Sequence, residues 1–247
     1  MVLKFYVLIK FTSTGGSGNA LSKSVAYFDN NFENSSNEKR SDYLERCSQI
    51  ALNGQVTPMD LARVKTVSGE VYTSFMSFGM GLLSDIDIDS ESLRALGELR
   101  FAIYGILKGI QLKSYRVRIT YVRMGEADAT VDEDDFVLVQ CVTKPWMAET
   151  LLVAPGFRSF NDGHICLVLI RKGVSRKSMF SWFLYQDKGY HVDMPYVSIV
   201  PVTWVRIEPA TKHGNMTIDG EVVDFGSVEA EILHSAGNVM TSKNLSE

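Results

Sequence analysis

The stretch MGLLSDIDIDSESLRALGELRF, residues 80–101, combines apolar side chains with closely spaced charges. Its acids Asp85, Asp87 and Asp89 occupy alternate positions, and two arginines follow them in a pattern typical of a helix. An unpaired buried carboxylate is very costly, so this stretch can join a protein core only if its acids have partners. The identity of those partners therefore decides both how this region folds and what it can bind.

The residues alone leave more than one interpretation of this acidic run. A calcium loop of the EF-hand type that began at Asp85 would require glycine at position 90 and glutamate at position 96. Ser90 and Leu96 stand there instead, which excludes such a loop. If the run is a strand, its three acids share one face. There they bind a cation, bind an amine or mark an exposed edge of a sheet.

The composition is that of an ordinary globular protein. A chain of 247 residues, 45% hydrophobic and 22% charged, is long enough for one large domain or two small ones. Its net charge of -4 argues against a general nucleic-acid binder, which needs a strong basic excess. Three widely spaced cysteines, Cys47, Cys141 and Cys166, favour a reduced, cytosolic chain. The histidines lack the spacing of a zinc site.

The sequence contains no apolar run long enough to cross a bilayer. The apolar run at 2–11 carries Lys4 and Lys10 and leads into glycines without a small-residue cleavage site, so it is predicted to be a strand rather than a signal peptide. Local basic groups such as Lys108 and Arg116 could contact an anionic membrane, although such groups more often form a solvated surface.

The beginning of the chain has the pattern of an anion-binding loop. The predicted strand is followed by a glycine-rich loop at 14–19 and a helical segment at 20–25. Strand, glycine loop and helix together direct backbone N–H groups at an anion. The loop lacks the Gly-Lys-Ser/Thr of a Walker sequence, and Asn19 stands where a nucleophile elbow has its last glycine. A phosphate site and a plain tight turn both stay open.

The rest of the chain is predicted to consist mainly of strands. They are expected at 60–67, 70–79, 115–122, 136–143, 164–171, 196–207, 215–218, 221–225 and 228–234. Helices are expected at 43–53 and 175–187, and Leu99, Ile103, Ile106 and Leu107 form a further helix face. The acidic stretch at 125–135 is expected to be a loop. This order indicates an α+β protein in which a mainly antiparallel β-sandwich follows α/β material.

Two further groups of charged residues have a structural and a functional interpretation. Asp219-Gly220-Glu221 has the pattern of a type I′ hairpin turn. Arg94 and Arg100 could clamp a phosphate bidentately, although arginines on a helix surface are more common. Composition and spacing thus lead to a chain of two parts with a candidate anion loop and an acidic cluster.

Taken together, several segments resemble the sphingosine kinases, within the wider group of diacylglycerol-kinase-like lipid kinases. They follow the order of that family over almost all of residues 12–235. The segments are GGSGNAL at 15–21, SFGMGLLSDIDIDSESLRALGELRF at 77–101, LKSYRVRITY at 112–121, EDDFVLV at 133–139, GVSR at 173–176, DKGYH at 187–191, PYVSIVPV at 195–202 and DGEVV at 219–223.

The resemblance implies a lipid kinase with two domains. Residues 1–57 would be a remnant of the α/β nucleotide-binding domain with its glycine loop, and residues 58–247 a β-sandwich that binds the lipid. The implied reaction transfers the γ-phosphoryl group of ATP, with Mg²⁺, to the primary hydroxyl of sphingosine to give sphingosine 1-phosphate. The resemblance also implies a cytoplasmic protein that associates peripherally with membranes.

The resemblance assigns roles to individual residues. Those implied to bind the nucleotide are Gly16, Ser17, Gly18, Asn19, Arg94, Arg100, Asp219 and Glu221, and the last two would also lie close to the metal. Those implied to bind the lipid are Ser77, Leu82, Leu83, Ile86, Asp87, Phe101, Met147, Leu151, Val168, Met179, Trp182, Phe183, His191 and Val197. Asp87 would hold the ammonium group, with Ser77 near the polar head. Burial of the lipid tail contributes about 0.8 kcal/mol per CH₂.

The chain departs from the family at the catalytic base. The family carries that base as the aspartate of an S/G-G-D-G motif, whereas the Asp-Gly pairs here are Asp162-Gly163 and Asp219-Gly220. No catalytic residue is therefore assigned, and the chain resembles a kinase without most of its ATP domain, so we expect little or no phosphate transfer by these residues alone. Alternatives are a non-catalytic module that binds sphingoid bases, and a kinase for ceramide or diacylglycerol. Asp87 favours a cationic head group, because a neutral lipid leaves its carboxylate unpaired.

Overall fold

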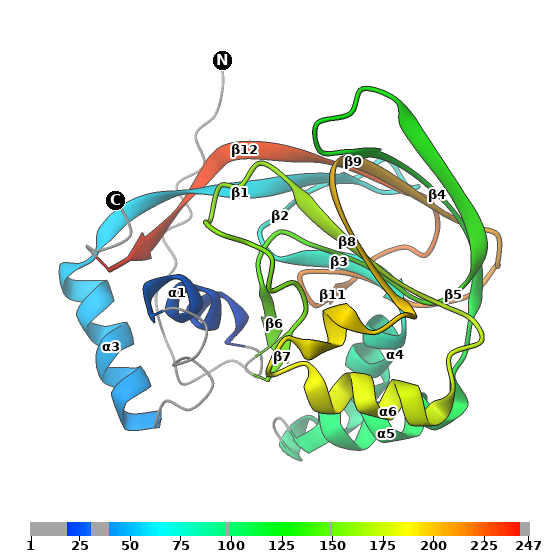
Figure 1. Cartoon of the computed structure of the whole chain (residues 1–247), viewed down its shortest axis with the longest axis horizontal. Coiled ribbons are helices and arrows are strands. Elements are labelled where there is room, and N and C mark those ends of the chain that lie inside the picture. Colours follow the sequence, from blue (N-terminus) through cyan, green and yellow to red (C-terminus); the bar gives the residue numbers. More distant parts are fainter. Residues whose placement is uncertain (1–18, 31–39, 97–98, 149, 243–247) are drawn as a thin grey trace.

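The structure of this protein is a computed structural model that describes residues 19–30, 40–96, 99–148 and 150–242. One large antiparallel sheet dominates it, and the helices lie in two groups (Figure 1). The helices α4, α5 and α6 lie together below the sheet in this view, while α1 and α3 lie at its other end. The protein is thus of mixed α/β class with a mainly antiparallel sheet, as predicted.

The order of the strands in the sheet differs from their order along the chain. Its path runs β11 (Glu221–Val222), β10 (Met216–Ile218), β3 (Ser77–Gly81), β5 (Ala129–Val142), β4 (Tyr115–Arg123), β9 (Val197–Pro209), β12 (Val228–Thr241), β1 (Gln55–Lys65) and β2 (Val71–Ser74). The strand β8 (Ile165–Arg171) lies off this path and pairs with both β5 and β9. Since β4 pairs with the same two long strands, β5 and β9 each have β4 along one half and β8 along the other.

The prediction of a loop at 125–135 is wrong for most of that stretch, because β5 begins at Ala129. Its acidic residues are balanced by cations on neighbouring strands. Arg171 forms ion pairs with Asp132 and Asp134, and Arg116 with Glu133 at 3.0 Å. Cross-strand pairs of opposite charge stabilise a sheet, so an acidic sequence that looks like a loop is a strand here.

The strand predicted at 70–79 is interrupted between β2 and β3. The predicted hairpin around Ser68-Gly69 is confirmed, because β1 and β2 pair antiparallel with Lys65 opposite Val71. Gly81, the last residue of β3, has a φ of 89°, and the chain turns there directly into the helix α4 (Leu82–Asp89). Glycine alone adopts that conformation readily. The acidic run is therefore helical, and its interpretation as a strand is wrong.

The remaining elements surround the sheet. They are α1 (Ala20–Asn30), α3 (Arg40–Asn53), the 3-10 helix η1 (Ser90–Leu96), α5 (Leu99–Gln111), the strands β6 (Trp146–Ala148) and β7 (Leu151–Leu152), α6 (Arg176–Tyr185) and the 3-10 helix η2 (Tyr190–Asp193). The helix α6 begins where the Ser175 hydroxyl accepts a hydrogen bond from the Ser178 N–H, a typical N-cap. Among the described helices, none is both long and apolar enough to cross a membrane.

Three apolar clusters fill the interior. The first lies within the sheet, and the third joins α1 and α3 to β1 and β12. The second lies between the sheet and the helices α4 and α6, and we call it the α4–α6 cluster. Its buried members are Leu82, Leu83, Ile86, Val137, Leu138, Val142, Val153, Ala154, Phe157, Cys166, Val168, Ile170, Met179 and Trp182.

The close approach of β3 and β5 can be tested at Gly79. A Cβ atom there would lie 2.4 Å from the Val139 carbonyl oxygen and 2.8 Å from the Gln140 side-chain oxygen. We expect Gly79→Ala to lower the free energy of unfolding by about 1–3 kcal/mol through overpacking. Gly156→Ala is the matched control, because nothing lies within 4 Å of its Cβ position. Denaturant unfolding of both variants checks this, and equal effects would contradict it.

Candidate functional site

The helix α4 sends its acids in different directions. Residues two positions apart lie on opposite sides of a helix, so Asp85 and Asp87 do not share a face. Asp85 is buried, and its two carboxylate oxygens accept hydrogen bonds from the Tyr115 hydroxyl at 2.7 Å and the Asn215 amide at 3.0 Å. Burial raises the pKa of Asp85, and these hydrogen bonds oppose the rise. Asp85 therefore joins α4 to the sheet.

The other two acids of the run each face a cation. Asp89 forms an ion pair with Lys108 on α5. Asp87 lies 3.9 Å from the guanidinium of Arg100, which also binds Glu91 at 2.6 Å. The Arg100 side chain is only 4% exposed, while that of Asp87 is 30% exposed. Burial raises the pKa of the Asp87 carboxyl, and the charge of Arg100 counteracts this rise.

Asp219 organises the backbone beside α4. Its carboxylate accepts hydrogen bonds from the Ser74 hydroxyl and from the backbone N–H groups of Phe75, Met76 and Ser77, at 2.8 to 3.0 Å. Three of these bonds go to Oδ1 and one to Oδ2. Burial raises the pKa of Asp219, and the hydrogen bonds oppose this. The carboxylate thus satisfies the backbone N–H groups of the segment that connects β2 to β3.

The hairpin that carries Asp219 brings its turn to Asp87. Asp219 and Gly220 have φ of 49° and 85°, and Ile218 pairs with Glu221, so the predicted two-residue turn with positive φ is confirmed. The Asp219 N–H donates to the Ser77 carbonyl at 2.7 Å. A Cβ at Gly220 would lie 3.6 Å from Asp87 Oδ2, and the charge of Glu221 contributes to the raised pKa of Asp87. Segments far apart in the sequence therefore meet at one polar site.

The apolar residues that the resemblance assigned to the lipid gather in the α4–α6 cluster. Its buried members include Leu82, Leu83, Ile86, Val168, Met179 and Trp182, and Met147, Leu151, Phe183 and Val197 pack against it. The buried ring of His191 lies edge-on to Trp182 and hydrogen-bonds the Val153 carbonyl at 2.9 Å. Burial lowers the pKa of His191. The polar site around Asp87 thus lies at one end of α4, and the cluster packs on the same helix.

Some of the predicted site residues lie outside the described part of the chain. Of the nucleotide site, this holds for Gly16, Ser17 and Gly18 and for the side chain of Arg94. Of the lipid site, it holds for the side chain of Phe101. Asn19, with a φ of 44°, stands directly before α1, where its carbonyl accepts from the Ser22 hydroxyl at 2.9 Å and the Lys23 N–H at 3.0 Å. Within the described part of the chain, no group of three or more His, Cys, Asp or Glu side chains is placed to hold a metal ion.

Sequence reasoning missed Tyr115, Asn215 and Glu91 as partners of the charged residues in this site. Tyr115 follows α5 at the start of β4, and Asn215 directly precedes β10. No local pattern connects either residue with α4, because both contacts depend on how the strands are ordered in the sheet. The signal that could have found them is the need of a buried Asp85 for two hydrogen-bond donors.

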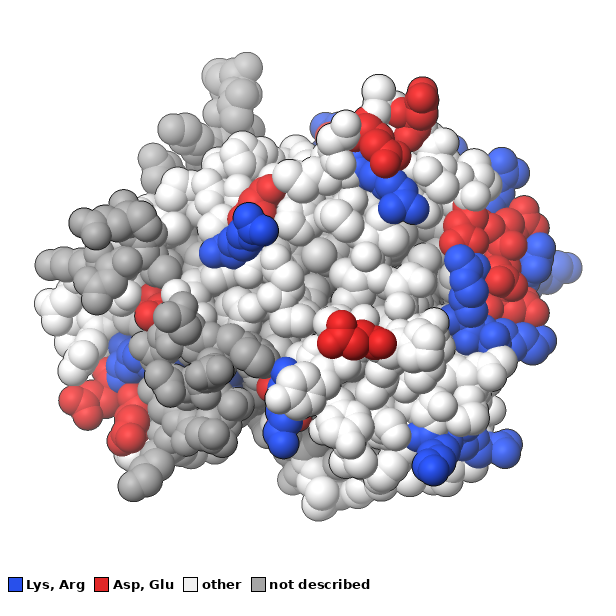
Figure 2. Space-filling model, viewed as in Figure 1, with Lys and Arg blue, Asp and Glu red and all other residues white. Residues whose placement is uncertain are grey.

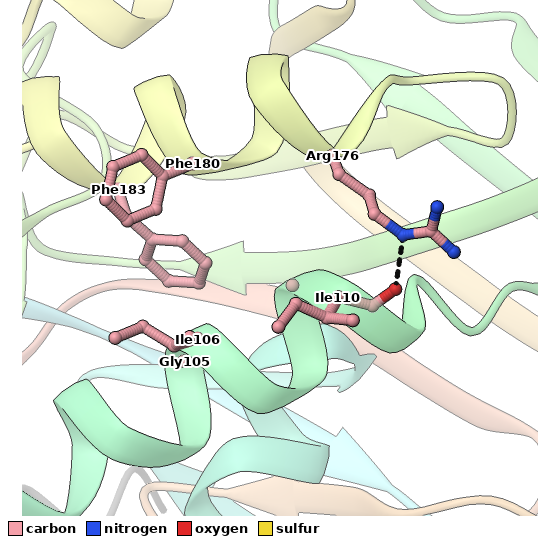
Figure 3. A pocket seen from close by; sticks show the side chains of 7 residues that line it. Gly105, Ile106, Ile110, Arg176, Phe180 and Phe183 are labelled. Carbon is pink, nitrogen blue, oxygen red and sulfur yellow. Dashed lines mark hydrogen bonds between the residues drawn. The ribbon is translucent and has the colours of Figure 1, made fainter.

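A shallow crevice of about 60 Å³ separates α5 from α6 (Figure 3). Phe183 and Phe180 extend from α6 toward Gly105 and Ile106 of α5, and the Arg176 guanidinium donates to the Ile110 carbonyl at 2.7 Å. A volume of this size holds a few water-sized groups. A long-chain lipid would therefore have to displace side chains or one of these helices.

The fold is similar to that of solved structures named as putative diacylglycerol kinases. A crystal structure of a putative diacylglycerol kinase from Bacillus anthracis str. Sterne matches 94% of this chain and 68% of its own chain, with a TM-score of 0.63 and 18% identity. A second structure of a putative diacylglycerol kinase from the same organism has a TM-score of 0.60. At this identity the likeness concerns the fold alone. No protein-family model matches the chain.

At the level of sequence, the chain is a homologue of the sphingosine kinases. Sphingosine kinase 1 of Rattus norvegicus is 31% identical over 249 residues, which cover 88% of this chain and 64% of the relative. The Homo sapiens protein of that name is 30% identical with the same coverage, and the Caenorhabditis elegans one is 27% identical. The resemblance inferred from the motifs is confirmed. The chain spans 64% of the length of the mammalian relatives.

The structural role of Asp219 can be separated from any role of its neighbour. In Asp219→Asn an amide N–H₂ group replaces one acceptor and faces backbone N–H groups, so we expect a loss of about 1–3 kcal/mol in the free energy of unfolding. Glu221→Gln changes an exposed side chain on the same hairpin, and we expect a change within about 0.5 kcal/mol. Chemical denaturation measures both. An Asp219→Asn variant as stable as the parent would show that the four hydrogen bonds do not hold this region together.

Proposed function

We propose that the chain provides the lipid site and part of the nucleotide site of a sphingosine kinase. The proposed reaction transfers the γ-phosphoryl group of ATP to the primary hydroxyl of sphingosine and yields sphingosine 1-phosphate. The observation that carries this proposal is Asp87, a half-buried carboxylate on the same helix that packs into the α4–α6 cluster. An amine with a long apolar tail matches both features. The relatives named sphingosine kinase support the same assignment.

Asp87 and Ser77 are proposed to bind the head group of the lipid. The carboxylate pairs with the ammonium group, and a charge-assisted hydrogen bond of this kind contributes about 1.5–3 kcal/mol. Ceramide and diacylglycerol carry no such charge. The expectation that a neutral lipid leaves Asp87 unpaired is wrong, because Arg100 lies 3.9 Å from its carboxylate, so a neutral lipid would lack only the additional bond to the ammonium group. The α4–α6 cluster would take the tail, within a β-sandwich domain at 58–247 that follows a nucleotide-binding remnant at 1–57.

Arg100 is proposed to connect the head group with the nucleotide phosphates. Its guanidinium already faces the carboxylates of Asp87 and Glu91, so it is held where a second anion can compete for it. Arg94 and the loop residues Gly16, Ser17, Gly18 and Asn19 would contribute further donors, as the resemblance implies. ATP then binds beside the hairpin of Asp219 and Glu221.

Magnesium is proposed to bind with the nucleotide. Mg²⁺ in kinases is held by one or two carboxylates together with phosphates and water. Glu221 is exposed, and Asp219 Oδ2 accepts a single hydrogen bond, so both residues retain oxygen atoms for a cation. The ion would neutralise charge on the phosphates. No residue of this chain is assigned the role of general base, since the 247 residues contain no S/G-G-D-G motif.

The protein is also proposed to contact membranes peripherally through α5 and α6. Exposed apolar side chains gather there, and Figure 2 shows few charges over α6. They are Leu99, Ile106, Leu107, Ile110, Phe180 and Leu184. Arg176 and Lys177, both exposed, stand at the beginning of α6 and would attract anionic lipids. This surface lies beside the crevice between the two helices, so a lipid could pass from a bilayer toward the cluster.

The head-group assignment predicts that Asp87→Ala weakens sphingosine binding by about 10- to 100-fold, the loss of one charge-assisted bond. Asp89→Ala is the matched control, because it removes an acid of the same helix that pairs with Lys108 and surface pairs contribute little. Isothermal titration calorimetry measures both affinities. Unchanged binding by Asp87→Ala would sink the role of Asp87 in amine recognition.

The affinity of the parent protein should also depend on pH. Burial raises the pKa of Asp87 above the ordinary carboxyl value, and only the ionised form pairs with an ammonium group. Binding therefore weakens as the pH falls through this raised pKa, and Asp87→Ala shows no such weakening.

The membrane assignment predicts that two acidic substitutions on α5, Ile106→Asp with Ile110→Asp, reduce partition into vesicles at least tenfold. Burial of one such side chain contributes about 1.5–3 kcal/mol. The control is Val131→Asp with Val222→Asp, two exposed valines on strands. Sedimentation with vesicles of phosphatidylcholine and phosphatidylserine provides the measurement. Equal losses in the two variants would argue against a docking surface on α5.

A further inference from the structure

Gln140 on β5 has a buried amide side chain without a hydrogen-bond partner among the residues that the structure describes. Its side chain is 1% exposed. Neither its amide oxygen nor its amide nitrogen forms a hydrogen bond within the described part of the chain. Burial of an amide without compensation costs about 1–3 kcal/mol. Such a residue in the middle of a central strand requires an explanation.

The alternation along β5 places Gln140 on the face of the α4–α6 cluster. Leu138 and Val142, two positions before and after it, belong to that cluster, whereas Val139 and Cys141 belong to the cluster within the sheet. Successive side chains of a strand point to opposite faces. Gln140 therefore lies on the face that packs against α4 and α6.

The residues that pair with Gln140 on the neighbouring strands also place it next to the α4–α6 cluster. Gln140 pairs with Val168 of β8 on one side and with Gly79 of β3 on the other. Its Oε1 lies 2.8 Å from the position a Cβ would take at Gly79, so the amide extends over this glycine. Ser77 stands two residues along β3, about 7 Å away. Gln140 thus lies between the proposed head-group residue Ser77 and the apolar residue Val168.

Trp182 adds an independent observation in the same cluster. Its side chain is buried, and its indole N–H has no acceptor among the residues that the structure describes. Buried indole N–H groups usually have a partner. The α4–α6 cluster therefore contains more than one polar atom that a ligand could satisfy.

We propose that Gln140 is a specificity-determining residue that binds the C4 hydroxyl of a sphingoid base, which lies beyond the C3 hydroxyl that sphinganine and 4-hydroxysphinganine share. The inference rests on the proposed function, keeps a sphingoid base as the substrate, and changes the preferred base from sphingosine to one that carries a C4 hydroxyl. A hydroxyl both donates and accepts, so it can donate to Oε1 and accept from Nε2 of the same amide. A carbonyl can only accept, and an ammonium group can only donate. The preferred substrate is then a 4-hydroxylated sphingoid base rather than sphinganine or sphingosine, which carry no C4 hydroxyl.

The test compares two lipids that differ by that hydroxyl, 4-hydroxysphinganine and sphinganine. Affinities are measured by isothermal titration calorimetry with the full chain, for the parent protein, Gln140→Leu and Gln140→Met. We expect the parent protein to prefer 4-hydroxysphinganine by about 5- to 30-fold, since a site built for a hydroxyl is left unpaired by the analogue that lacks it. Both variants should lose this preference while they bind sphinganine at least as tightly as the parent.

Equal affinity of the parent protein for the two bases, or a preference that survives in Gln140→Leu, would overturn the inference. Failure of the proposed function looks different, because then neither base binds or Asp87→Ala leaves both affinities unchanged. Thermal unfolding of the lipid-free protein gives a second measurement. Gln140→Leu should raise the midpoint, because it replaces an unpaired amide by an apolar side chain in an apolar cluster. A lower midpoint would show that Gln140 has partners inside the protein, which contradicts the proposal.

Discussion

The arrangement of this site depends on the hydrogen bonds that the Asp219 carboxylate accepts. This carboxylate takes up the hydroxyl of Ser74 and three consecutive backbone N–H groups at the break between β2 and β3. Such a break would otherwise leave buried donors unpaired, which proteins avoid. Because Asp219 stands in a tight hairpin turn, the same bonds fix that turn against β3. Gly220 of this hairpin turn lies against Asp87.

The acidic helix α4 can pack against the apolar cluster because each of its aspartates has a partner. The three aspartates of α4 have different partners. Asp85 accepts hydrogen bonds from neutral donors, Asp87 faces Arg100, and Asp89 pairs with Lys108. The three carboxylates also differ in how much of each stays exposed to solvent. Asp85 is enclosed and serves the fold, whereas Asp87 and Asp89 both stay partly exposed. Asp89 pairs directly with Lys108, while Asp87 lies 3.9 Å from Arg100 and beside the hairpin of Asp219. This difference makes Asp87 the candidate for recognition.

The boundary between polar site and apolar cluster gives the proposed lipid its orientation. One end of α4 and the hairpin provide carboxylates and a guanidinium, and the other face of the same helix packs on β5, β8 and α6. A ligand with a charged head and an apolar tail fits this gradient. Gln140 interrupts the gradient with an amide where hydrocarbon is expected. In the proposed site, this amide would distinguish one amphipathic amine from another.

Local patterns in the sequence were sufficient for most of the elements and for the family. The strand β4 follows from apolar alternation, and β1, β8 and β9 follow from segments rich in apolar and β-branched residues. The hairpin turn at Asp219 follows from Asp-Gly, and α3 and α6 from segments that look helical. These signals are local, because they depend on residues a few positions apart. The homology to sphingosine kinases likewise follows from motifs that occur in a fixed order.

The tertiary structure decided what the charged residues do. Whether DIDID is a strand or a helix depends on the turn at Gly81 and on partners from β4 and the segment before β10. The acidic start of β5 is a strand because Arg116 and Arg171 come from other strands. The apolar face of α5 includes Leu99, Ile106 and Leu107, which are exposed rather than part of the core. Periodicity reveals that a helix has an apolar side, but only the neighbouring elements determine whether that side is covered, because burial and charge pairing depend on contacts between distant parts of the chain.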